Sequence, residues 1–198
     1  MRRLAVAVLA AAVCVTVAVS ALAITARGGG KQSAERSGGP RELKAFRRPA
    51  EAGDAVPRRA LGPLARRFGA VVASRRIATA SGFRGRATIY LLRLKRNYTC
   101  LIQLDRGAAG GGCSPSRDFL SPGRAVAAGA GDGFFHGVAA NEIARVAFVD
   151  PHGRWHAVRL TRDGGFIYVC RARNGCINVI RAVNGYDRRG RLVSHERW

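Results

Sequence analysis

The sequence predicts a mainly β protein: a small antiparallel sandwich or open barrel with one short N-terminal helix, preceded by a transmembrane or signal helix. Three observations predict this class: a long apolar N-terminal segment, short β-prone runs between turn residues after Gly82, and four cysteines beyond the apolar segment. Many short strands with no helix between them are typical of antiparallel sandwiches and barrels. About 130 residues follow the N-terminal region, enough for one domain core.

The first predicted element is the apolar segment at residues 4–26, which follows Arg2 and Arg3 and contains no charged residue. As a helix it would extend about 34 Å and could cross a bilayer. Cleavable signal peptides have shorter apolar regions, but residues 21–23 form a suitable small-x-small cleavage site, so both interpretations stay open. We predict that residues 1–26 are a membrane anchor or a signal peptide, and that this helix is the chain's contact with the membrane.

The orientation of the chain depends on which of two signals is given more weight. The basic residues that follow the apolar segment would, by the positive-inside rule, place the domain in the cytoplasm. The cysteines indicate the opposite, because each lies close in sequence to one partner, as is typical of local disulfides in an oxidising compartment. We therefore predict a single-pass cell-membrane protein with its C-terminal domain outside, or a secreted protein if the signal is cleaved.

Four cysteines allow three pairings, and we predict the local one, Cys100 with Cys113 and Cys170 with Cys176. The first bond would close the glycine-rich loop RGAAGGG and contribute about 3 kcal/mol, and the second would close a short turn and contribute about 2 kcal/mol. A structural zinc site is the alternative, but neither pair has the two-residue spacing that such sites favour. We predict no metal and no cofactor.

The rest of the chain divides into a linker at residues 27–57 and a folded domain at residues 58–198. The linker begins with glycine, serine and basic residues, which predicts a flexible tether as far as about Gly53. Within it, Phe46 and two prolines in residues 43–57 predict an extended arm able to dock on the domain. Apolar residues then recur at helical spacing between arginines and predict one short amphipathic helix, whose stripe is Leu61, Leu64, Phe68, Val71 and Val72.

After Gly82 the pattern predicts antiparallel hairpins, because short β-prone runs flank turn residues such as glycine, asparagine, aspartate and proline. A last strand is predicted around Leu192 and Val193, after the turn that begins at Asp187. The four predicted hairpins pair residues 87–94 with 98–104, 124–130 with 134–140, 143–150 with 154–161, and 166–170 with 176–183.

Residues that could carry catalysis are few. The histidines have no nucleophile and no orienting carboxylate close by in sequence, so each is predicted to be structural or solvated: His136, His152, His156 and His195. The carboxylates in turns are predicted to cap their own backbone: Asp150, Asp163 and Asp187. We therefore predict a non-enzymatic protein with no catalytic residue.

The net charge of +22 comes from 34 lysines and arginines against 12 acidic residues, and it is spread along the chain. Such a charge attracts polyanions, including anionic envelope polymers, although codon bias toward arginine would produce the same composition. No strand interleaves aromatic and basic residues, so we expect no specific nucleic-acid binding. The leading hypothesis is a membrane-anchored interaction or adhesion domain of the envelope, and the alternative is a basic polyanion or nucleic-acid binding module.

Several runs of the sequence form one recognisable pattern. "FRRPAEAGDAVP" is followed by "LARRF", by a cysteine pair that begins at "YTC", by "IARVAFVDPHGRWHAVRL" and by "RAVNGYDRRGRLV". Over residues 43–193 this pattern resembles a family of uncharacterised secreted or membrane-anchored proteins of actinobacteria. The resemblance implies no activity, ligand or catalytic residue. The pair Cys170 and Cys176 is not part of the pattern and depends on its own spacing.

Overall fold

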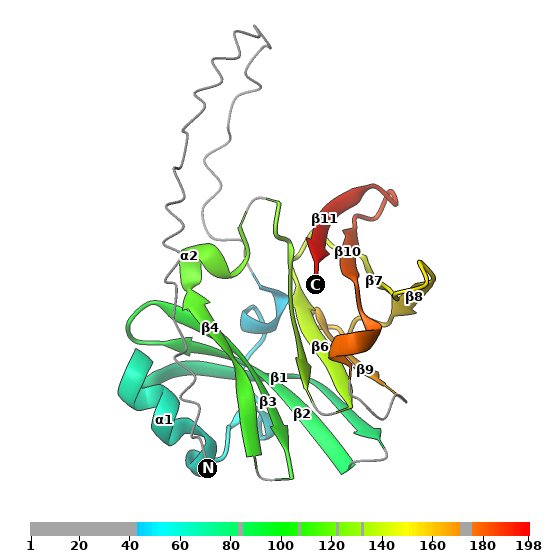
Figure 1. Cartoon of the computed structure of the whole chain (residues 1–198). Helices are drawn as coiled ribbons and strands as arrows, with labels where there is room; N and C mark the ends of the chain where they lie inside the picture. Colours follow the sequence, from blue (N-terminus) through cyan, green and yellow to red (C-terminus); the bar gives the residue numbers. More distant parts are fainter. Residues whose placement is uncertain (1–42, 83–84, 107, 122, 132, 171–175) are drawn as a thin grey trace, which may run out of the picture. The chain divides into compact units, whose positions relative to one another are not determined.

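The computed structural model describes residues 43–198 except for 83–84, 107, 122, 132 and 171–175. The predicted anchor or signal helix at residues 4–26 and the first part of the predicted tether lie outside these residues. No helix within the described part is both long and apolar enough to span a bilayer. The described chain is mainly β, as predicted, and its strands form three antiparallel sheets (Figure 1).

Sheet A consists of four strands that follow one another in sequence and in space: β1 (Val71–Gly82), β2 (Gly85–Leu94), β3 (Tyr98–Asp105) and β4 (Ala108–Pro115). The β2–β3 pairing confirms the first predicted hairpin. Its turn contains Asn97 at a φ of 61°, a left-handed conformation that asparagine adopts more readily than most residues. The strands therefore form a simple meander.

Sheet B has the order β5 (Val126–Gly131), β6 (Phe134–Ala139) and β9 (Gly165–Val169). The β5–β6 pairing confirms the second predicted hairpin. Sheets A and B meet where β1 lies close to β9. There the hydroxyl Oγ1 of Thr161 donates a hydrogen bond of 2.8 Å to the carbonyl of Ile77. This junction leaves β4 and β5 as the free outer strands of the two sheets.

Sheet C has the order β11 (Leu192–Arg197), β10 (Ala182–Tyr186), β7 (Arg145–Val149) and β8 (Trp155–Val158). It contains the predicted β7–β8 hairpin and the predicted last strand. The fourth predicted hairpin is wrong, because β9 pairs with β6 while β10 pairs with β7. The two strands belong to different sheets, so tertiary packing overrides the local turn signal between them.

Two further predictions are corrected by the structure. The amphipathic helix α1 (Arg58–Phe68) ends at Gly69, whose φ of 87° suits glycine, and Val71 already begins β1. The glycine-rich segment predicted as a loop is strand β4. Gly111 makes this pairing possible, because a Cβ there would lie 2.1 Å from the carbonyl oxygen of Leu101. Glycine is thus required for close strand pairing here.

The buried apolar side chains form two clusters. The larger cluster lies among the three sheets and includes Phe135, Val146 and Phe166. The smaller cluster lies between α1 and the outer face of sheet A, where Leu92 and Cys100 are fully buried. A short helix α2 (Ser116–Phe119) follows β4 and contributes the buried ring of Phe119 to the larger cluster. Sheet A is therefore covered on both faces.

Both predicted disulfides are present, Cys100 with Cys113 across β3 and β4, and Cys170 with Cys176 after β9. Each joins cysteines close in sequence, at separations of 13 and 6 residues. The first bond attaches the glycine-rich strand β4 to the sheet beside the smaller apolar cluster. The bonds hold together segments whose glycine content raises the conformational entropy lost on folding.

Replacing both Cys170 and Cys176 with serine is expected to lower the free energy of unfolding by about 2 kcal/mol, because the unfolded chain loses a loop constraint. Urea unfolding followed by tryptophan fluorescence measures the change. Reducing agent added to the same variant should then remove a further increment of about 3 kcal/mol through the remaining bond. Unchanged stability in the serine variant would show that this disulfide does not constrain the unfolded chain.

Residues 43–57 pack against β1 through polar contacts. Arg48 donates two hydrogen bonds to the carboxylate of Asp54, at 2.7 and 2.8 Å, and its Nε contacts both carboxylate oxygens of Asp163 at 3.0 and 3.1 Å. Asp54 also accepts the backbone N–H groups of Glu51 and Arg76 at 2.8 Å. Arg48 therefore connects this segment to the loop before β9, and both carboxylates are buried.

Candidate functional site

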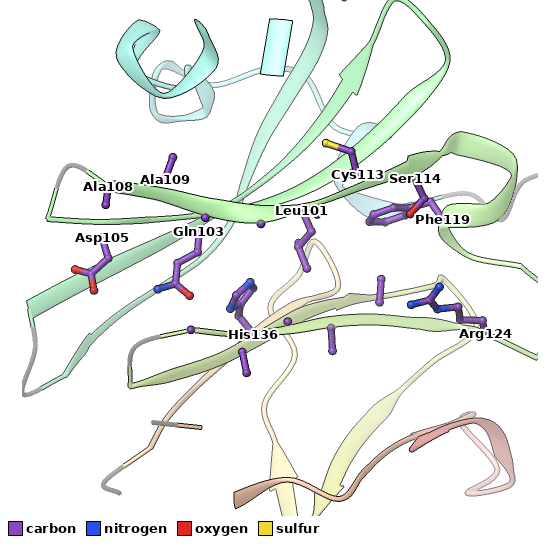
Figure 2. A pocket seen from close by; sticks show the side chains of 18 of the residues that line it. Leu101, Gln103, Asp105, Ala108, Ala109, Cys113, Ser114, Phe119, Arg124 and His136 are labelled. Atoms are coloured by element: carbon purple, nitrogen blue, oxygen red, sulfur yellow. The ribbon is translucent and has the colours of Figure 1, made fainter. Parts of the chain in front are cut away.

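A cleft of about 640 Å³ lies between the outer strands of sheets A and B. Strands β3 and β4 form one wall, and β5 and β6 form the other (Figure 2). A cavity of this volume is within the range of small-molecule and short-segment binding sites. The side chains used below come from these walls and from the chain just outside them: Gln103, Asp105, Arg106, Phe119, Arg124 and His136.

The cleft is open because its walls are built from very small residues. The cross-strand partners of Leu101, Gln103 and Asp105 on β4 are Gly112, Gly110 and Ala108. A Cβ added at Gly110 or Gly112 would have no neighbour within 4 Å. Since cross-strand partners lie on the same face of a sheet, β4 contributes almost no side-chain volume on the cleft side. The cleft therefore exists because positions 110 and 112 of β4 are glycine and carry no side chain.

His136 lies on β6 opposite Gly129 of β5, and its side chain points into the cleft (Figure 2). A Cβ at position 129 would be 3.0 Å from Nε2 of the imidazole, so glycine makes room for the ring. The residue is only 4 % exposed, and this burial lowers the pKa of the imidazole to about 4. At neutral pH the ring is uncharged, and its buried Nδ1 has no hydrogen-bond partner in the described chain.

Gln103 extends from β3 toward His136 on the opposite wall (Figure 2). Its side chain is close to Gly131, where an added Cβ would be 2.8 Å from Oε1. Gln103 is 8 % exposed, and its buried Oε1 has no hydrogen-bond partner among the described residues. The same is true of Oδ1 of Asp105, two residues further along β3. Three unpaired polar atoms thus line one cleft.

Unpaired buried polar atoms cost free energy, commonly about 1–3 kcal/mol each, and native structures contain few of them. Their concentration in one cavity indicates a place where hydrogen-bonding groups of a ligand or of water are bound. The cleft has an arginine near each end, Arg106 after β3 and Arg124 before β5. Arg124 forms an ion pair with Glu196 and is still half-exposed. Between the arginines the cleft presents the neutral imidazole of His136, the amide of Gln103 and the carboxylate of Asp105.

The other histidines lie elsewhere. His156 stacks on Phe148 with ring centroids 4.6 Å apart, and its Nε2 is 3.1 Å from Oδ2 of Asp150. His195 contacts the side-chain oxygen of Asn184. His156 therefore has a carboxylate and an aromatic ring as neighbours.

Two of the three predicted turn carboxylates cap their own turn, and the third binds a distant arginine. Asp150 accepts the backbone N–H groups of His152 and Arg154, and Asp187 accepts those of Arg189 and Arg191, which confirms both turn caps. Asp163 instead binds Arg48 across 115 residues of sequence. Within the described residues, no three His, Cys, Asp or Glu side chains gather closely enough to hold a metal ion.

Sequence reasoning placed His136 among structural histidines and did not single out Gln103. A signal was present, because Gln103 is the polar residue inside the apolar run YTCLIQL. The chain is thus a β-rich domain with two disulfides and an open polar cleft between the outer strands of two sheets. No protein-family model, no curated protein and no solved structure matches the chain.

Proposed function

We propose that this chain is a non-enzymatic extracytoplasmic protein of the cell envelope, a membrane-anchored domain that acts in interaction or adhesion. The observation that carries the proposal is the pair of local disulfides, because such bonds form and persist in oxidising compartments. The apolar segment at residues 4–26 supplies the anchor, or the signal if the protein is secreted. The meeting of sheets A and B around the cleft supports an open-barrel or sandwich architecture.

The cleft supports binding over catalysis. It contains a buried neutral imidazole, an amide and a carboxylate oxygen, and two of these three groups come from the same strand. Catalysis by a histidine would require a neighbouring nucleophile or a positioned water together with a group that orients the ring. Among the described residues, Nδ1 of His136 has no hydrogen-bond partner that would orient the ring. The same polar atoms are well suited to hold a bound group.

Counting free thiols tests the proposed location. Full-length protein is isolated with the membrane fraction, alkylated without reduction and digested for mass spectrometry. We expect the cysteines at positions 100, 113, 170 and 176 to remain unlabelled, whereas reduction before alkylation should label all four. Labelling of these four cysteines without reduction would place the domain in a reducing compartment and refute the proposal.

The alternative is a polyanion-binding module, which the net charge of +22 favours. Heparin or DNA binding measured at about 50 and 200 mM salt separates the two functions, because each phosphate contact releases counterions and steepens the salt dependence. Steep salt dependence with useful affinity near physiological salt would favour the alternative. Weak binding that disappears at the higher salt would reflect only the long-range field of the domain.

A further inference from the structure

We propose that the cleft between β4 and β5 binds an extended peptide that carries acidic residues near both ends. The inference rests on the proposed function, since it assigns a partner class to the interaction domain. Three independent features of the described structure carry it: an unprotected sheet edge, the buried unpaired polar groups, and the arginines near the two ends of the cleft.

The sheet edge is the first feature. Strand β4 is the outer strand of sheet A, and its residues 108–112 are exposed. Outer strands present unpaired backbone N–H and C=O groups, and proteins commonly protect them with charged residues or proline. Residues 108–112 are only alanine and glycine. An extended peptide can therefore add to this edge as a further strand through backbone hydrogen bonds.

The buried polar groups are the second feature. Gln103 and His136 are both more than nine-tenths buried, point into the cleft from opposite walls, and each has an unpaired polar atom. A peptide added to β4 would direct every second side chain toward the cleft. Small polar side chains such as threonine or asparagine offer both donors and acceptors to a neutral imidazole and an amide. These side chains would satisfy atoms that the domain leaves unpaired.

Charge is the third feature. Arg106 and Arg124 line the cleft near its two ends, Arg124 is half-exposed beside its partner Glu196, Arg106 follows Asp105, and the chain as a whole is strongly positive. Residues 124 to 131 form or precede β5, and at about 3.3 Å per residue this length is about 23 Å, which an extended peptide of about seven residues also spans. Carboxylates near both ends of such a peptide would face one arginine each. Charge complementarity of this kind speeds association and selects partners.

The test uses full-length oxidised protein in detergent micelles and a fluorescein-labelled peptide of about seven residues with blocked termini. The peptide has aspartate at each end and alternating valine and threonine between. Fluorescence polarisation is expected to show saturable binding. Replacing the terminal aspartates with lysines should weaken binding by about tenfold or more, and N-methylation of alternate backbone nitrogens should abolish it in one register only.

Two variants at neighbouring positions distinguish an effect on the cleft from a general effect on strand β4. Gly110→Val places a side chain in open cleft space and should weaken peptide binding by about tenfold without loss of folding. Ala109→Val lies on the same exposed strand, but this side chain points away from the cleft (Figure 2), so its affinity should stay within about twofold. Circular dichroism verifies that both variants are folded.

Three outcomes would overturn the inference. The first is equal weakening by Gly110→Val and Ala109→Val, and the second is equal affinity for the aspartate and lysine peptides. The third is absence of peptide binding, including cases where a neutral saccharide binds the cleft or where a second copy of the chain pairs through β4 in analytical ultracentrifugation. If the four cysteines are nevertheless oxidised in membrane-isolated protein, only the peptide inference fails and the proposed location stands.

Discussion

Asp54→Ala is expected to lower the free energy of unfolding by about 3 kcal/mol, because it leaves the partly buried guanidinium of Arg48 with Asp163 alone and removes the acceptor of two backbone N–H groups. The Asp54 carboxylate is 3 % exposed and accepts two hydrogen bonds from Arg48 as well as two from backbone N–H groups. Urea unfolding followed by tryptophan fluorescence measures the loss. The variant should also release residues 43–57, which faster proteolysis of that segment would show.

Asp118→Ala is the matched control, since the Asp118 carboxylate is exposed and pairs only loosely with its sequence neighbour Arg117 at 3.6 Å. We expect a change within about 0.5 kcal/mol there. Equal losses at positions 54 and 118 would contradict the assigned importance of the buried pair.

Hydrogen bonds from Arg48 hold the pKa of Asp54 well below its usual range. This contribution to stability is therefore present above the unfolded pKa of about 4 and is lost as the pH falls below it.

Lowering the pH from 7 to about 4 is expected to reduce the free energy of unfolding by about 3 kcal/mol through His136 alone. Burial lowers the pKa of this imidazole from 6.5 to about 4 in the folded protein. Between those values the unfolded chain binds a proton that the folded chain does not, so acid favours unfolding. Stability should rise with pH through this window and level off near neutral pH.

Unfolding measured at several pH values in His136→Gln tests this prediction, because glutamine does not titrate and the slope between pH 4 and 6.5 should largely disappear. His152→Gln is the control, since His152 is exposed in a turn and should leave the slope unchanged. The window lies above the pH at which Asp54 loses its contribution, so the two effects can be separated. A slope that persists in His136→Gln would contradict a buried neutral imidazole at this position.

Several parts of the fold followed from the sequence, and all of them depend on contacts between near neighbours in the chain. Short β-prone runs on either side of turn residues predicted the hairpins β2–β3, β5–β6 and β7–β8. The two disulfides were predictable for the same reason, as each cysteine has its partner within 13 residues. A short chain segment contains the whole physical cause of such features, including turn conformation and cross-strand packing.

The tertiary structure alone decided the cleft and the packing of residues 43–57. The composition of glycines 110–112 predicted a loop. Pairing with β3 instead makes them part of a strand, and the absence of side chains there leaves the cavity open. Gln103 and His136 meet because two different sheets face each other, and Arg48 reaches Asp163 across 115 residues. Local propensity cannot predict such contacts, because their free energy depends on which distant segments pack against each other and are buried from water. The sequence therefore determined three hairpins and the two disulfides, and packing between sheets determined the cleft and the separation of β9 from β10.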